Sequence, residues 1–396
     1  MDPNRPRASK TSMADLLLGT VVGERYKLTR RLGEGAMGWV FLAEHVEIGK
    51  RLAVKVLRPS LCRQPEAVSR FRREARAASA IGSDHIIEIT DFGQTSTGAA
   101  YYVMELLQGE DLAKTLKREG KLPWTRARHI LRQMCSCLQA AHDQGIVHRD
   151  VKPANVYRIE RQNDPDFIKV LDFGIARLAN PADSVITATG VVMGTPDFMS
   201  PEQAQGRKVD HRADIYALGA SAYTLVTGKP PFSGKNEYEV IYQHLNAEPS
   251  PPSEVAPDAG IPAWVDEAIL CAMHKNPEDR FESMSEFLEA LEGPPDVREA
   301  EAKAKAAETD KPMLPPKAKP GREKTGQVKA SGSGSGKAKR APKGSSSSGE
   351  RARRSAASGD RKRSRPKKAE PPIPVWLIVV VVAAVVGGLV YALVPR

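Results

Sequence analysis

The first third of the chain alternates short apolar runs with turns that contain glycine. These runs are rich in β-branched and aromatic residues and are too short for typical helices, so they predict strands. The expected strands are residues 26–32, 40–44, 52–57, 86–92 and 101–106. One segment within this series, residues 65–81, instead has the apolar spacing of a helix.

Beyond residue 111 the apolar positions recur mostly with a helical period. Helices are expected at residues 124–144, 211–227 and 264–273, with a turn-rich stretch at 147–201. The pattern therefore predicts an α+β body over residues 26–291, in which a small β-rich lobe is joined to a larger α-helical lobe. Such a length suits one two-lobed domain.

Residues 375–394 form a second kind of apolar segment, with twenty consecutive uncharged positions. As a helix this segment would be about 30 Å long, the thickness of a bilayer's hydrocarbon core. Trp376 and Tyr391 lie near its ends, where aromatic rings prefer the membrane interface. We expect a single transmembrane helix rather than a buried core helix. The basic residues that precede it predict a cytoplasmic location for the N-terminal part of the chain.

The segment from 292 to 372 is rich in Ala, Lys, Pro, Ser and Gly and is expected to be a disordered basic linker. Residues 311–370 hold 19 Lys and Arg against 4 Asp and Glu, a net charge of +15, whereas residues 1–310 carry −5. Anionic membrane lipids are the expected partner of this linker. A merely solvated tether is an equal alternative, and the lack of interleaved aromatic residues argues against specific nucleic-acid binding.

Residues 1–25 are predicted to form an N-terminal arm. Their apolar run, residues 16–18, is far too short for the core of a signal peptide. The four cysteines are scattered and lack a CxxC pair, so neither a disulfide framework nor a structural zinc site is expected.

Residues 33–38 read GEGAMG, a GxGxxG pattern that occurs in several nucleotide-binding folds. The following residues continue as a strand, so the glycines are expected at the tip of a hairpin rather than at the start of a Rossmann helix. No GxxxxGK[ST] sequence is present, which excludes a P-loop. Lys55 stands in the apolar strand 53–56; a lone lysine there is ordinarily on an exposed face.

Further motifs follow in a fixed order: residues 148–155 read HRDVKPAN, 172–174 read DFG and 200–202 read SPE. With the glycine hairpin and Lys55, this series resembles the protein kinase superfamily over residues 26–291. The sequences GAMG and SPEQA are most similar to the corresponding motifs of bacterial serine/threonine kinases. Lys152 and Thr195 resemble the pattern of Ser/Thr-specific members, and the Ser at position 200 departs from the usual APE.

The resemblance implies ATP-dependent phosphorylation of Ser or Thr on protein substrates. Lys55 would hold the α- and β-phosphates and would itself be held by an ion pair with Glu74. Asp150 would orient the incoming hydroxyl and accept its proton, and Lys152 would neutralise the γ-phosphate. For Asp150 the structural alternative is a turn or cap residue.

The resemblance also implies Mg²⁺ as a cofactor beside ATP, with Asn155 and Asp172 as its oxygen ligands. The Glu105 carbonyl and the Leu107 amide would meet the adenine, and Asp111 is a weaker candidate for the ribose. The implied nucleotide-binding residues are Leu32, Gly33, Glu34, Gly35, Ala36, Met37, Gly38, Val40, Ala53, Lys55, Glu105, Leu107 and Asp111.

Other motif positions are expected to be structural. The resemblance implies that His148 is a buried packing residue beside Phe173, without proton chemistry. It also implies that Asp214 fixes the backbone of the catalytic loop and that Glu202 and Arg280 form a buried pair.

Thr187 and Thr189 are expected phosphorylation sites in the activation segment, because they resemble activating threonines in bacterial relatives. Arg149 could pair with an added phosphate. Ordinary solvent-exposed threonines are the alternative.

An inactive kinase fold that acts as a membrane-tethered scaffold is the alternative function, although the catalytic residue types are all present. Besides protein substrates, a second copy of the chain is an expected partner, phosphorylated in trans. Ala384, Gly388 and Ala392 recur every four residues in the predicted span, a spacing that would permit a homodimer.

Overall fold

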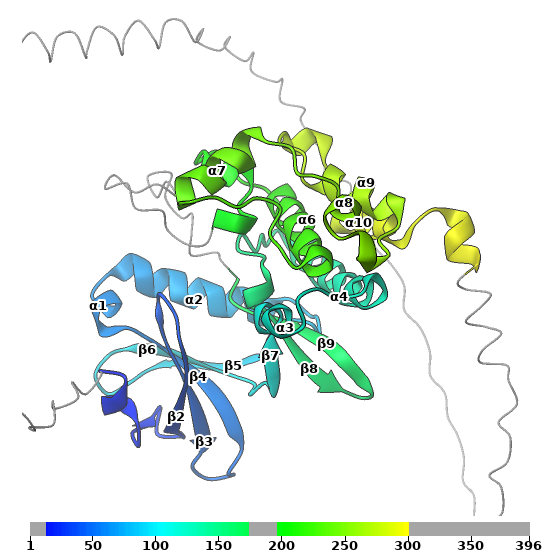
Figure 1. The fold of residues 1–396 in the computed structure, drawn as a ribbon. Coiled ribbons are helices and arrows are strands. Elements are labelled where there is room, and N and C mark those ends of the chain that lie inside the picture. Colours follow the sequence, from blue (N-terminus) through cyan, green and yellow to red (C-terminus); the bar gives the residue numbers. More distant parts are fainter. Residues whose placement is uncertain (1–12, 174–195, 301–396) are drawn as a thin grey trace, which may run out of the picture. The chain divides into compact units, whose positions relative to one another are not determined.

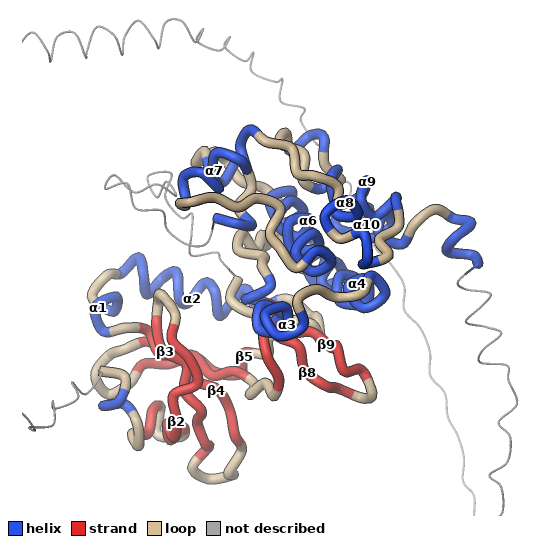
Figure 2. The backbone as a smooth tube through the Cα atoms, in the orientation of Figure 1, coloured by secondary structure: helices blue, strands red, loops and turns tan. Residues whose placement is uncertain are grey.

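The computed structural model describes residues 13–173 and 196–300. The N-terminal lobe is built on a six-stranded antiparallel sheet with the order β1-β2-β3-β4-β6-β5 (Figures 1 and 2). Leu28, Phe41, Val54 and Val103 are fully buried and belong to one cluster of core residues. The strands are β1 (Val21–Val22), β2 (Tyr26–Glu34), β3 (Gly38–His45), β4 (Arg51–Leu57), β5 (Ile89–Gln94) and β6 (Ala100–Met104).

Two helices, α1 (Pro59–Cys62) and α2 (Pro65–Ala80), follow β4. A proline at the first position of each suits a helix start, where the missing N–H costs nothing. The buried face of α2 includes Phe71 and Glu74, and Phe71 packs with Tyr102 of β6. The helix thereby carries one acidic side chain into the interior of the lobe.

The C-terminal lobe is mainly helical, and its centre is α6, in which every residue from 213 to 227 is buried. Polar side chains accept a hydrogen bond from the first turn of several helices, including Asp111, Asn236 and Ser283. The helices are α3 (Leu112–Glu119), α4 (Trp124–His142), α5 (Pro201–Ala204), α6 (Arg212–Thr227), α7 (Glu237–Asn246), α8 (Pro252–Val255), α9 (Ala263–Ala272) and α10 (Met284–Glu292). Short 3₁₀ turns are η1 (Asp15–Leu17), η2 (Pro153–Asn155), η4 (Pro196–Phe198), η5 (Pro257–Ala259) and η6 (Pro277–Asp279).

A second sheet has three strands, β7 (Gly109–Asp111), β8 (Val156–Arg161) and β9 (Asp164–Val170), and lies next to the HRDVKPAN and DFG sequences. Residues 147–155 precede β8, and residues 171–173 follow β9, so the hairpin brings both motif regions to one end. The expected turn-rich stretch at 147–201 therefore contains two strands that its apolar pattern did not reveal.

Several element boundaries differ from expectation by one to three residues. The strand expected from residue 86 begins at Ile89, because Ile86 instead bridges to Val170 beside the second sheet. The strand expected to reach residue 106 ends at Met104. The arm expected over residues 1–25 is partly folded, since Ala14 and Val22 lie in the core of the N-terminal lobe.

Within the segment predicted as a disordered linker, residues 295–300 are instead helical. Among the described residues, no helix combines the length and apolar character needed to cross a bilayer. The predicted span at 375–394, the linker from 301 onward, and Thr187, Thr189 and Thr195 lie outside the described residues.

Candidate active site

The glycine motif forms the turn between β2 and β3, as the sequence indicated. The Gly35 amide donates to the Gly38 carbonyl at 2.9 Å. A Cβ on Gly38 would lie 2.1 Å from the Val56 carbonyl oxygen, so only glycine fits there, whereas a Cβ on Gly33 would meet open space. The backbone at Gly33 and Gly35 is thus free to approach a phosphate closely.

Arg58 fixes this turn, a contact that the sequence reasoning missed. Its guanidinium donates to a Glu34 carboxylate oxygen at 2.5 Å and to the Gly35 carbonyl at 3.0 Å. The hydrogen bond from Arg58 lowers the pKa of Glu34. Glu34, expected beside the nucleotide, therefore also braces the hairpin. The remaining hairpin candidates are Leu32 on β2, Ala36 and Met37 in the turn, Val40 on β3 and Ala53 on β4.

Lys55 of β4 is buried and sits between two carboxylates. Its Nζ lies 2.9 Å from Glu74 Oε1 of α2 and 2.6 Å from Asp172 Oδ1, and the Tyr102 hydroxyl donates to the same Glu74 oxygen at 2.9 Å. Lys55 is thus buried and paired rather than exposed, which was the alternative for a lone lysine in a strand.

The protonation states of this cluster follow from burial and charge. Burial alone would lower the pKa of Lys55, but Asp172, Tyr102 and Glu74 outweigh it and hold the pKa well above its usual value. Burial raises the pKa of Glu74, and Lys55 offsets this only in part. Desolvation opposes ionisation of Asp172, but Lys55 lowers its pKa below the ordinary value. The cluster therefore presents a fixed cation to a bound phosphate.

The catalytic-loop candidates are brought together around Asp150. The Lys152 ammonium lies 3.0 Å from one carboxylate oxygen of Asp150, and the Asn155 amide donates to the same oxygen at 2.9 Å. Asn155 also donates to the Asp150 carbonyl at 2.8 Å. This leaves the side-chain oxygen of Asn155 as the atom able to bind a cation. Asp150 is therefore positioned by side chains and is not a helix cap.

Asp214, at the start of α6, holds the loop backbone as expected. It is fully buried and accepts from the amides of His148 and Arg149, both at 2.7 Å. His142, not singled out from the sequence, lies 2.8 Å from the same carboxylate. Arg149 has a positive φ of 66°, a conformation that these two hydrogen bonds stabilise.

His148 is a buried structural residue, as predicted. Its ring centroid lies 4.6 Å from that of Phe173, and its Nε2 lies 3.0 Å from the Leu171 carbonyl oxygen. The Asp150 amide donates to Nδ1 at 3.2 Å. With both ring nitrogens engaged by backbone, the imidazole links the two motif regions.

The segment after β6 carries the adenine candidates. The Glu105 side chain accepts from the Glu88 amide at 2.9 Å and pairs with the buried Lys169 at 2.6 Å, a link that the sequence did not reveal. In the described part of the chain, neither the Glu105 carbonyl nor the Leu107 amide has a backbone partner. Both are therefore available to an adenine ring.

Asp111 has a structural role that competes with the ribose contact. Its carboxylate accepts from the Lys114 amide at 2.9 Å as the N-cap of α3 and pairs with the Lys114 ammonium at 2.6 Å. This weaker candidate is thus engaged by its own helix.

Asn155 and Asp172 fit Mg²⁺ by the chemistry of their oxygens. Mg²⁺ is usually held by one or two protein oxygens together with substrate phosphates and water. The described residues contain no cluster of three or more His, Cys, Asp or Glu able to hold a metal by themselves. Any Mg²⁺ at this site would therefore be shared with the phosphates of the nucleotide.

Behind the site, Arg280 and Glu202 form the expected buried pair, with two contacts of 2.8 Å. Ser200 forms a capping box with Gln203 at the start of α5. This contact gives a structural reason for serine where the family commonly has alanine.

Residues 26–290 match the protein kinase domain family. The chain is 41% identical over 285 residues to the serine/threonine-protein kinase pkn3 of Myxococcus xanthus. The aligned segment is 72% of this chain and 52% of pkn3. The chain is also 45% identical over 278 residues to the serine/threonine-protein kinase Pkn1 of Myxococcus xanthus, and the aligned segment is 70% of this chain and 39% of Pkn1.

The serine/threonine-protein kinase PknB of Mycobacterium tuberculosis is 41% identical over 269 residues, covering 67% of this chain and 42% of PknB. The chain thus spans about two fifths to a half of the length of these relatives. The crystal structure of the M. tuberculosis PknI kinase domain superposes with a TM-score of 0.53 at 30% identity, covering 69% of this chain and 96% of that domain. The family match, the relatives and the arrangement of the site agree that the chain belongs to the protein kinase family.

Proposed function

We propose that this protein transfers the γ-phosphate of ATP to Ser and Thr hydroxyls of other proteins. One observation carries the proposal: the Lys55–Glu74 pair, Asp172 and the Asp150–Lys152–Asn155 cluster are all assembled. Relatives that match over most of the described residues are named serine/threonine-protein kinases.

Each residue has a role that its surroundings support. The Asp150 carboxylate is held by two neighbouring donors, so it can orient a substrate hydroxyl and take its proton as the new O–P bond forms. The bond from the γ-phosphorus to the bridging oxygen breaks, and ADP leaves with that oxygen. Lys152 and Lys55 supply positive charge to the transferring group and to the α- and β-phosphates. Mg²⁺, held by Asn155 and Asp172, would neutralise further phosphate charge.

The proposed activity is tested by incubating the purified full-length chain with γ-labelled ATP, Mg²⁺ and casein, followed by phosphoamino-acid analysis. Label on Ser and Thr is the expected result. Label confined to Tyr, or no label on casein or on the chain itself while ATP still binds, would contradict it. The second of these results would support the inactive scaffold.

We also propose that the activation segment is switched on by phosphorylation of Thr187 and Thr189 by a second copy of the chain. Arg149 supports this: its Nε is buried without a hydrogen-bond partner among the described residues. Buried polar atoms of this kind usually find a partner, and a phosphate is well matched to a guanidinium.

This switch predicts that Thr187→Ala/Thr189→Ala lowers the rate of casein phosphorylation by tenfold or more, about the effect of losing one charge-assisted contact. Mass spectrometry of the wild-type chain after ATP treatment should find phosphate at these positions. A double variant with unchanged rate would remove the switch from the proposal and leave the catalytic assignment intact.

The location is a further part of the proposal: residues 375–394 anchor the protein in a membrane, and the kinase domain is cytoplasmic. Its support is the uncharged segment and the basic residues that precede it. Lipid binding by the linker rests on the +15 charge of residues 311–370.

A further inference from the structure

Arg149 and Asp150 form the centre of the catalytic loop, and side chains hold their backbone. In the part of the chain that the structure describes, none of their amides and carbonyls has a backbone partner. The Arg149 amide donates to Asp214 at 2.7 Å, and the Asp150 amide donates to His148 at 3.2 Å. The Asp150 carbonyl accepts from Asn155 at 2.8 Å. Three of the four backbone groups are thus satisfied by residues of the expected site.

The fourth group, the Arg149 carbonyl, is held by Gln203 of α5, a residue without a role in the proposed reaction. The side-chain amide of Gln203 is buried and donates to this carbonyl at 2.9 Å. The carbonyl belongs to the peptide bond that joins Arg149 to Asp150. The contact therefore restrains the backbone immediately before the proposed catalytic base.

Ser200 determines which end of the Gln203 side chain faces the catalytic loop. The Ser200 amide and the Ser200 hydroxyl both donate to Gln203 Oε1, each at 3.1 Å. Because Oε1 can only accept hydrogen bonds, it must face these two donors, and the NH₂ group is left for the Arg149 carbonyl. The capping box of α5 thus also orients the group that contacts the catalytic loop.

The short helix α5 is a firm base for this contact. Glu202, the neighbour of Gln203, forms the buried pair with Arg280. Arg149 has a positive φ of 66°, a conformation that costs free energy unless the surrounding contacts hold it. With Asp214 at its amide and Gln203 at its carbonyl, Arg149 is held on both sides.

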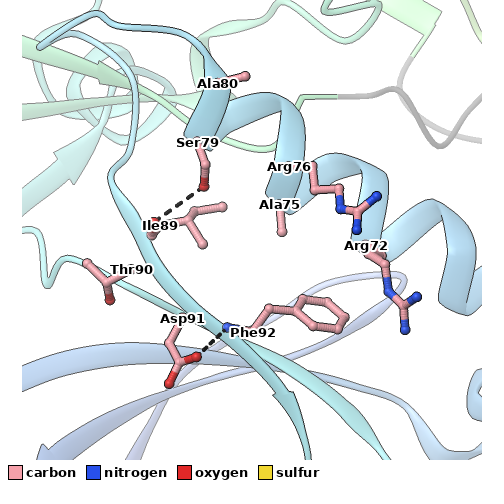
Figure 3. Close-up of a pocket in the computed structure, with 9 residues that line it drawn as sticks. All are labelled: Arg72, Ala75, Arg76, Ser79, Ala80, Ile89, Thr90, Asp91 and Phe92. Atoms are coloured by element: carbon pink, nitrogen blue, oxygen red, sulfur yellow. Dashed lines mark hydrogen bonds between the residues drawn. The ribbon is translucent and has the colours of Figure 1, made fainter.

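The contact is separate from the features of the N-terminal lobe. Neither Gln203 nor Ser200 lines the pocket between α2 and β5, which Figure 3 shows. Among the described residues, the Gln203 side chain has hydrogen bonds only to Ser200 and Arg149, and neither is a predicted nucleotide-binding residue. Loss of the contact should therefore disturb phosphoryl transfer more than ATP binding.

We propose that Gln203 is a positioning residue for phosphoryl transfer. Its amide fixes the Arg149–Asp150 peptide bond and thereby the direction of the Asp150 carboxylate. A small displacement of a catalytic group lowers the rate strongly, because the reacting atoms must be aligned. The effect on turnover rests on the proposed function, whereas the restraint on the catalytic loop does not.

Two substitutions separate this role from the cap of α5. Gln203→Met has a similar length but no donor, whereas Gln203→Glu keeps the acceptor that a capping box needs. In the full-length chain at pH 8, each should lower kcat for casein phosphorylation by about tenfold, with nearly unchanged Kd for ATP. Gln205→Glu is the matched control, because Gln205 at the end of the same helix is exposed.

A pH profile distinguishes the two substitutions. In Gln203→Glu, the introduced carboxyl group can donate to the Arg149 carbonyl only while it is protonated, and burial favours the protonated form. Its kcat relative to wild type should therefore recover several-fold between pH 8 and pH 6. Gln203→Met should show no such recovery, because it has no donor at either pH.

Three kinetic results would overturn the proposal. Wild-type kcat at pH 8 in Gln203→Glu would show that only the cap of α5 matters. Equal ratios to wild type at both pH values in Gln203→Glu would show that the hydrogen bond is not the cause. A loss of ATP affinity as large as the loss of kcat would show a general distortion of the site. Circular dichroism of each variant checks that it is folded.

Hydrogen exchange tests the restraint on the loop without reference to activity. In the full-length chain without ATP, the amides of residues 148–152 should exchange several-fold faster in Gln203→Met than in wild type or Gln205→Glu. Equal exchange in Gln203→Met and wild type would overturn the proposal. Faster exchange in Gln203→Met, together with an inactive wild-type chain, would contradict the proposed function and leave the restraint standing.

Discussion

At the residue scale, Gly38 shows how one absent methyl group shapes the nucleotide hairpin. Gly38→Ala would place a Cβ 2.1 Å from the Val56 carbonyl oxygen, so β3 and β4 must separate. We predict a loss of about 1 to 3 kcal/mol in the free energy of unfolding, measured in urea.

Gly33→Ala is the matched control, because its Cβ would meet nothing within 4 Å. Its unfolding free energy should stay within about 0.5 kcal/mol of wild type. Equal destabilisation by the two substitutions would show that the close approach to Val56 does not explain the glycine.

The sequence pointed to the candidate catalytic side chains and, through the resemblance, to Glu74 and Asp214, which hold them in place. It did not point to every side chain that braces the site. Lys55, Asp150 and Asp172 belong to motifs whose residue types follow from phosphate chemistry. Lys169 was not found, because it is one cation in strand β9 and its partner Glu105 is 64 positions away. Such contacts depend on the packing of distant segments, which residue patterns do not specify.

At the element scale, α7 carries a buried histidine that makes stability depend on pH. Burial lowers the pKa of His244 to about 3, and nearby Lys275 acts in the same direction. The neutral ring is held by Tyr216, whose hydroxyl lies 2.8 Å from Nδ1. In the unfolded chain this histidine has its ordinary pKa of about 6.5. The neutral His244 ring therefore contributes fully to the free energy of unfolding above pH 6.5, and that contribution is lost as the pH falls toward 3.

We predict that the wild-type protein loses unfolding free energy when the pH falls from 7.5 to 5.5. This loss should be about 1.4 kcal/mol smaller in His244→Gln. The measurement is urea unfolding at both pH values. His274→Gln is the control, since His274 is exposed. An unchanged pH dependence in His244→Gln would mean that this ring does not remain neutral in the folded protein.

Long helices were better predicted than strands near the lobe junction. Residues 124–144 and 211–227 were expected to be helical, and α4 and α6 lie there. Their many periodic apolar positions make the signal strong. β8 and β9 were hidden in a turn-rich region, because short, partly exposed strands give little periodicity.

At the scale of the whole molecule, residues 1–310 and residues 311–370 differ in net charge, which is −5 for the first and +15 for the second. We predict that full-length protein expressed in bacteria sediments with membranes and that deletion of residues 375–394 releases it. Protease added outside spheroplasts should leave the kinase domain intact, because the basic flank favours a cytoplasmic location. Recovery of wild-type protein in the soluble fraction would contradict the anchor.

In the proposed reaction, Asp150 takes the proton of the substrate hydroxyl in a site that also contains the Lys55–Glu74 pair. The most direct measurement compares the phosphorylation rate and the ATP affinity of wild type and Asp150→Asn. We predict a fall in kcat of about 100-fold or more with nearly unchanged Kd for ATP, because the loss of a catalytic base spares the phosphate contacts. If folded Asp150→Asn protein phosphorylated casein at close to the wild-type rate, Asp150 would not be the catalytic base.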